Sequence, residues 1–108
     1  MARRLGPWYP AGMDTLDSPT IDAALTELQG WERDGDTIRR DYKLDGFRDA
    51  IDLIVRIADL ADDANHHPEL TNVYNNLTVV LTTHDAGGIT QKDLDLAAAI
   101  EATATTGS

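Results

Sequence analysis

The segment ELTNVYNNLTVVLTTHD, residues 69–85, decides the fold class, because it has the period of strands between two segments with the period of helices. Its second half alternates, with Leu77, Val79, Leu81 and Thr83 on one side and Thr78, Val80, Thr82 and His84 on the other. We predict a short strand near 70–74 and a longer one at 77–84, with a bulge or bend at Asn75-Asn76. The first, more apolar side of the longer strand should lie on the helices.

The flanking segments have helical spacing. From Gly46 to about Ala64 we predict the longest helix. Its apolar stripe would be Phe47, Ala50, Ile51, Ile54, Val55, Ala58 and Ala61. A last helix is predicted at about 91–103. Its buried side would be Leu94, Ala97, Ala98 and Ile100. Thr90 and Asp93 have the spacing of a capping box at the start of this helix.

The N-terminal half adds one helix and one hairpin. Ser18-Pro19 is typical of a helix start, with Ser18 as N-cap, and the apolar spacing ends near Gly30. Asp34-Gly35 is a strong hairpin signal and predicts strands at about 31–34 and 36–43. The whole order is α-β-β-α-β-β-α. We therefore predict an α+β two-layer sandwich, in which the helices cover one face of an antiparallel four-stranded sheet.

Length and composition indicate a single domain. The chain has 108 residues, and we predict an arm with little structure at 1–17, one domain at 18–104 and a frayed tail at 105–108. The formal net charge is -10, which would repel nucleic acid and anionic membranes. No cysteine is present, so neither disulfides nor thiolate sites can form. The N-terminal residues lack the apolar core of a signal peptide, and we expect a cytoplasmic protein.

All three histidines of the chain fall within one short segment. His66 and His67 follow the predicted long helix, and His84 ends the predicted strand. A strand end and a loop can meet over one cleft. Asp62 lies four residues before His66 and could orient it or support its protonated form. Since unperturbed histidine titrates nearest to neutral pH, this grouping indicates a functional site.

Three interpretations of the histidines stay open on the residues alone. One is structural, with imidazoles that only bind backbone groups. The second is a metal site made by His66 or His67, His84 and an acid, although the spacing matches no common zinc motif. The third is general acid–base catalysis without a metal, with two imidazoles on either side of a substrate. The physics of the sequence does not choose between the second and third.

One multi-residue pattern resembles a known family. Asp62, then His66-His67-Pro68, then Tyr74, His84 and Asp93 follow at the spacings of the pterin-4a-carbinolamine dehydratases, also known as dimerisation cofactors of a hepatocyte nuclear factor. The similarity covers roughly residues 20–102. It implies a saddle-shaped α+β fold with the helices on one side. It also implies removal of water from 4a-hydroxytetrahydropterin to give quinonoid dihydropterin, the recycling step for tetrahydrobiopterin.

The resemblance also implies residue roles. His66 and His84 match the acid–base pair of the family, and Asp62 matches the acid that supports the first histidine. His67, Pro68 and Asp93 match positions that help to hold the substrate, and Asp93 could equally be a helix cap. No metal and no organic cofactor are expected. The expected partners are a small pterin and further copies of this chain, as a homodimer or homotetramer, with no direct contact to nucleic acid or membrane.

The chain departs from the family at Leu70, where tryptophan is common, and at Leu44 and Leu53, where phenylalanine is common. Two rival functions remain. One is a non-catalytic binding or assembly module on the same fold, resembling the Rubisco assembly factors or the transcription cofactors. The retained histidines favour the enzyme over this module. The other rival is a metal-binding protein, which metal analysis of untagged protein would detect.

Overall fold

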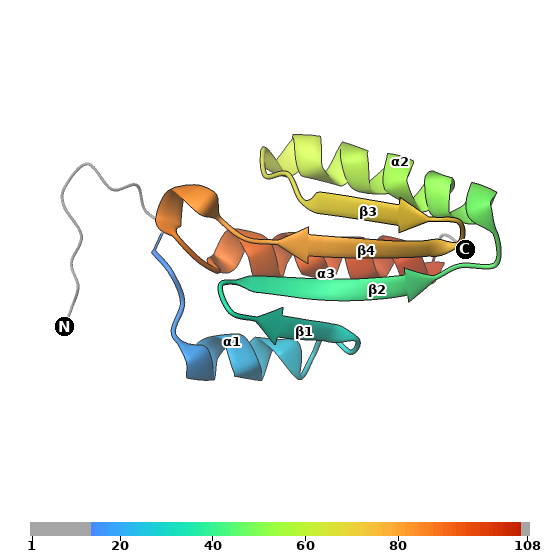
Figure 1. Cartoon of the computed structure of the whole chain (residues 1–108). Coiled ribbons are helices and arrows are strands. Elements are labelled where there is room, and N and C mark those ends of the chain that lie inside the picture. Colours follow the sequence, from blue (N-terminus) through green and yellow to red (C-terminus); the bar gives the residue numbers. More distant parts are fainter. Residues whose placement is uncertain (1–13, 107–108) are drawn as a thin grey trace.

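The predicted α+β sandwich is confirmed in a computed structural model, which describes residues 14–106. The elements run in the order α1 (Ser18–Leu25), β1 (Trp31–Asp34), β2 (Thr37–Lys43), α2 (Phe47–Ala64), β3 (Glu69–Val73), β4 (Asn76–Leu81), the short 3-10 helix η1 (His84–Ala86) and α3 (Gln91–Thr106). The antiparallel sheet has the strand order β1-β2-β4-β3. In Figure 1, α3 lies behind the sheet, with α2 beside β3 and α1 beside β1.

Strand β4 lies inside the sheet, and its alternation is as predicted. Leu77, Val79 and Leu81 are fully buried, while the residues between them are partly exposed. The strand ends earlier than predicted, at Leu81, and His84 opens η1 instead. The bend predicted at Asn75-Asn76 is present between the two strands, but it lies one residue earlier. Val73 pairs with Asn76, so Tyr74 and Asn75 form a two-residue hairpin turn, with Tyr74 at φ +52°.

The first hairpin is confirmed, but its turn is shifted by one residue. Asp34 pairs with Thr37, so the turn consists of Gly35 and Asp36. Gly35 has φ +61°, a conformation that glycine adopts without the steric cost that a side chain brings. Because Thr37 pairs with Asp34, β2 starts one residue later than the sequence indicated.

Helix boundaries differ at three places. The N-cap of α1 is Asp17, whose Oδ1 accepts from the Thr20 N–H at 3.0 Å, and not Ser18. The helix ends at Leu25, and a series of turns carries the chain to Gly30. Helix α3 continues to Thr106, beyond the predicted end at 103, and so includes part of the predicted tail. Each difference is a local choice between competing caps and turns, which sequence patterns resolve poorly.

The predicted N-terminal arm, residues 1–17, falls mostly outside the described residues. Its last residues join the domain. Leu16 packs on the core, and its N–H donates to the carbonyl of Ile89 at 2.9 Å. This contact holds residue 16 beside the loop that follows η1.

The predicted apolar stripe of α2 is only partly the buried one. Ala50, Leu53, Ile57 and Ala61 face the core, whereas Phe47 is 50% exposed and Val55 is 56% exposed. The helix has two overlapping apolar faces, and one sheet can cover only one of them. In α3, Leu94, Leu96, Ala97 and Ile100 are buried, while Ala98 is exposed, contrary to the prediction.

Glu101 ties α3 to the sheet at the end remote from the histidines. Its Oε1 accepts from Tyr42 OH at 2.6 Å, Trp31 Nε1 at 3.1 Å and Arg40 Nε at 3.3 Å. Burial raises the pKa of the Glu101 carboxyl, but the hydrogen bonds from Tyr42, Arg40 and Trp31 outweigh it, so the pKa lies below its usual value. Since the lowered pKa belongs to the folded state, ionised Glu101 stabilises the fold above the unfolded pKa, and this contribution is lost as the pH falls through the folded pKa.

We therefore expect Glu101→Gln to lower the free energy of unfolding at pH 7 by about 1–3 kcal/mol. The deficit relative to wild type should shrink below about pH 4, where glutamate in the unfolded chain becomes protonated. Urea unfolding at pH 7 and near pH 3 measures both values. Glu27→Gln, at an exposed position, is the matched control. An equal deficit at both pH values would show that the Glu101 charge does not contribute.

Candidate active site

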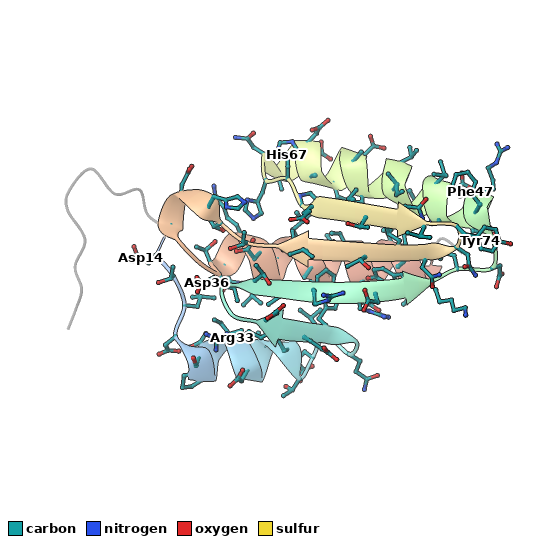
Figure 2. All side chains as sticks on the ribbon, viewed as in Figure 1. Asp14, Arg33, Asp36, Phe47, His67 and Tyr74 are labelled. Atoms are coloured by element: carbon teal, nitrogen blue, oxygen red, sulfur yellow. The ribbon has the colours of Figure 1, made fainter. Side chains whose placement is uncertain are left out.

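Three segments meet at one end of the sheet, where α2 ends, β4 runs into η1, and α3 begins. They enclose a shallow cavity of about 290 Å³. Its lining includes all three histidines, together with Asn65, Thr82, Thr83, Asp85 and Lys92. The expectation that the histidines share one cleft is therefore confirmed. Figure 2 labels His67 at this end, by the last turn of α2.

The end of α2 places His66 and His67. Asn65 adopts the left-handed conformation, with φ 50° and ψ 45°. The His66 N–H then donates back to the carbonyl of Ala61 at 3.0 Å, as in a Schellman motif. Pro68 prevents the helix from resuming. The helix therefore stops at Asn65, and the two imidazoles lie just beyond it.

A tight turn places His84. The Thr83 carbonyl accepts from the N–H groups of Ala86 and Gly87, both at 3.0 Å, and the Thr83 N–H donates to the Gly88 carbonyl at 2.9 Å. Gly87 has φ +81°, which favours glycine. Within residues 14–106, the His84 side chain is exposed and makes no hydrogen bond, so its ring is available to a bound molecule.

His66 is held by Asp93, not by Asp62. His66 Nε2 lies 2.5 Å from Asp93 Oδ1, the Asp93 side chain is fully buried, and the His66 side chain is 10% exposed. The predicted pairing of Asp62 with His66 is wrong, since Asp62 Oδ1 lies 3.0 Å from His67 Nε2 in an exposed pair. The left-handed Asn65 breaks the helical spacing that would have placed Asp62 next to His66.

Asp93 is also the helix cap that the sequence predicted. Its Oδ2 accepts from the Thr90 N–H at 2.9 Å, while Thr90 Oγ1 accepts from the Lys92 N–H at 3.2 Å. The capping box of α3 is therefore confirmed, with aspartate in place of glutamate. One carboxylate thus starts the helix and holds the imidazole.

The Asp93 contact fixes the chemistry of the His66 ring. An ionised carboxylate only accepts hydrogen bonds, so Nε2 carries a proton. In the neutral ring Nδ1 is then the nitrogen with a free lone pair. His66 can therefore accept a proton at Nδ1 while Asp93 stabilises the resulting positive charge.

Not every residue of the pattern lies at the cavity. Tyr74 is 64% exposed in the β3–β4 turn, and Figure 2 shows it at the opposite end of the sheet, near Phe47. Pro68, Asp62 and Asp93 are not among the lining residues either, although Asp62 contacts His67 and Asp93 contacts His66. The sequence analysis did not predict three lining residues, Lys92, Thr83 and Asp85. Each directly precedes or follows a residue of the pattern, and this adjacency is the signal that could have identified them.

Two further properties concern only the described residues. No three His, Cys, Asp or Glu side chains in the range 14–106 gather in a way that could hold a metal ion. Over the same range, no helix is both long enough and apolar enough to span a membrane.

The sequence pattern of the family described as Pterin 4 alpha carbinolamine dehydratase matches residues 14–103. The chain belongs to this family. Within it, a Thermomicrobium roseum protein is 48% identical over 85 residues, which cover 79% of this chain and 91% of that protein. A Mycobacteroides abscessus protein is 46% identical over 89 residues, covering 82% and 95%. Both carry the name "Putative pterin-4-alpha-carbinolamine dehydratase".

Two solved structures resemble the dehydratase fold of this chain. A transcriptional coactivator/pterin dehydratase from Brucella melitensis has a TM-score of 0.81 at 32% identity, over 84% of this chain and 99% of that one. A pterin dehydratase-like protein described as a RuBisCO assembly factor of the alpha-carboxysome has a TM-score of 0.60 at 15% identity, over 70% and 90%. The second likeness shows the fold alone.

Proposed function

We propose that this dehydratase-family protein removes water from a 4a-hydroxytetrahydropterin to give the quinonoid dihydropterin, using histidine side chains as acid and base. The observation that carries the proposal is the convergence of all three histidines on one cavity, with His66 held by a buried carboxylate. The names of the relatives supply the substrate class. In the reaction the bond from C4a to oxygen breaks, the N5 proton leaves, and water forms, with no change of oxidation state.

The two imidazoles have different surroundings and suit different steps. His66 has a protonated Nε2 held on Asp93, which leaves Nδ1 to take the N5 proton. His84 is exposed at the cavity and can, as imidazolium, protonate the leaving hydroxyl. His67, oriented by Asp62, would bind the edge of the pterin, with Pro68 shaping the loop. Asp62 then supports His67, a role different from the one expected from the sequence.

The test is the dehydration rate of freshly generated 4a-hydroxytetrahydropterin, followed by absorbance, with and without the protein. We expect a large acceleration over buffer, without added metal. A well-folded protein that gives no acceleration would refute the enzyme and favour the alternative, a non-catalytic binding or assembly module. The cytoplasmic location stays a prediction.

Self-association is part of the same proposal. Phe47 and Val55 lie two helical turns apart on the exposed face of α2, and Ile51 lies half-buried between them. Among the described residues, the edge strand β3 pairs only with β4. Val73 at its end and Tyr74 in the turn that follows are exposed. Exposed apolar side chains grouped in this way are typical of protein interfaces. We propose that a second copy of the chain covers them.

We expect sedimentation equilibrium to give a mass of two or four times 11.8 kDa. Val55→Asp should weaken the association by at least about 10-fold, because it buries an unpaired charge in the interface. Ala23→Asp, at an exposed position of α1, is the matched control and should leave the mass unchanged. A monomeric wild type at micromolar concentration would contradict the interface.

A further inference from the structure

Behind His66 lies a short chain of buried hydroxyl groups. Thr83 and Thr90 are 4% and 0% exposed. Thr83 Oγ1 lies 2.8 Å from Asp93 Oδ2 and 2.8 Å from Thr90 Oγ1, which in turn accepts from the Lys92 N–H. These contacts connect the end of β4, the capping box of α3 and the carboxylate that holds His66.

The direction of the hydrogen bonds follows from the number of protons. Each hydroxyl has one proton to donate, and the Asp93 carboxylate only accepts. Thr83 must therefore donate to Asp93 Oδ2, so Thr90 must be the donor to Thr83. The Thr90 oxygen is then left to accept from Lys92 N–H, as it does. The hydrogen bonds of these hydroxyl groups therefore all run in one direction, from Thr90 through Thr83 to Asp93.

The consequence is a carboxylate that cannot rotate. Asp93 Oδ2 is filled by two donors, the Thr83 hydroxyl and the Thr90 N–H, so Oδ1 is the oxygen that faces His66 Nε2. Turning the carboxylate would leave buried donors without a partner, which is costly. We propose that Thr83 and Thr90 are positioning residues, which act through Asp93 to hold His66 in the Nε2–H tautomer. The catalytic part of this inference rests on the proposed function.

The experiment compares Thr83→Val, which keeps the branched shape but removes the hydroxyl, with Thr83→Ser, which keeps the hydroxyl. In wild type, ¹⁵N NMR of the imidazoles should show the neutral His66 ring protonated at Nε2. We expect Thr83→Val to mix the two tautomers and to lower kcat by about 10- to 100-fold, with a much smaller change in KM. Thr83→Ser should keep the wild-type tautomer, and its kcat should stay within about threefold of the wild-type kcat.

Thr78→Val is the matched control. Thr78 lies in β4, five residues before Thr83, and its hydroxyl donates to a carboxylate, Asp41 Oδ1, at 2.7 Å, away from the cavity. It should change neither the His66 spectrum nor kcat. Thr90→Val removes the hydroxyl that is one hydrogen bond further from Asp93. It replaces Thr83→Val in the same experiment if Thr83→Val does not fold.

Two results would overturn the inference. One is a folded Thr83→Val protein with the wild-type His66 spectrum. The other is an equal loss of kcat in Thr83→Val and Thr83→Ser, which would indicate packing and not the hydroxyl. The NMR measurement does not depend on turnover. A wild type that is inactive but shows the Nε2–H tautomer would therefore refute the proposed function and leave the positioning intact.

Discussion

His66→Ala and His84→Ala should each lower the enzymatic dehydration rate by roughly 10²- to 10⁴-fold, the usual contribution of a general acid or base. Each removes one of the two proton transfers that the reaction needs at neutral pH. His66 is anchored by Asp93, and His84 opens η1 beside the same cavity. Absorbance of freshly generated 4a-hydroxytetrahydropterin gives the rate for each variant.

His67→Ala is the internal comparison. Its imidazole is 61% exposed and is paired with exposed Asp62, so we expect mainly a higher KM and a smaller loss of kcat. Near-UV circular dichroism and urea unfolding check that each variant keeps its fold. A folded His66→Ala or His84→Ala protein with kcat near wild type would remove that residue from the acid–base pair. If both kept full activity, the mechanism itself would be wrong.

Asp93→Asn should damage both activity and stability. An amide has one acceptor oxygen, whereas Asp93 accepts at both oxygens, from His66 at one and from Thr83 and Thr90 at the other. If the NH₂ group of the asparagine faces His66, the imidazole must change tautomer to accept a hydrogen bond from it. If the NH₂ group faces Thr83 and Thr90 instead, it is a donor placed against the buried donors of these two residues. We expect a loss of kcat of roughly 10²- to 10⁴-fold, as for other histidines that lose an orienting aspartate.

The cost in stability should be about 1–3 kcal/mol, because buried hydrogen-bonding groups lose their partners. Urea unfolding at pH 7 measures it. Asp62→Asn is the matched control, since it changes the same atoms in the exposed pair with His67. Its stability should stay within about 1 kcal/mol of wild type. If Asp93→Asn and Asp62→Asn behaved alike, burial of the Asp93 pair would not matter to the site.

The sequence predicted the fold through local rules that do not depend on the partner. Alternation of period two in Leu77–Leu81 requires a strand with one buried face, and the spacing in 46–64 requires a helix. The Thr90/Asp93 capping box and the Asp34-Gly35 hairpin signal marked an element start and a turn nearly to the residue. The errors in element bounds lie at the ends of helices, at the end of β4 and at turn centres, where competing local solutions differ by little energy.

The sequence predicted which residues form the site, but not which carboxylate contacts which histidine. The histidine spacing and the family pattern named His66, His84 and Asp93, and the structure brings His66 and His84 to one cavity. Which acid serves which histidine depends on where the chain turns after α2. Because Asn65 is left-handed, Asp62 meets His67 and leaves His66 to Asp93, 27 residues further along the chain. No local spacing rule covers a contact of that range.

By itself, then, the sequence determined the order of the elements, the buried face of β4, the cap of α3 and the residue types of the site. Each follows from periodicity or from hydrogen bonds within a few residues. Only the tertiary structure decided which apolar face of α2 lies on the sheet, that Tyr74 lies far from the histidines, and that Thr83 and Thr90 support Asp93. These depend on how three separate segments pack together, and a pattern along one chain does not record that packing.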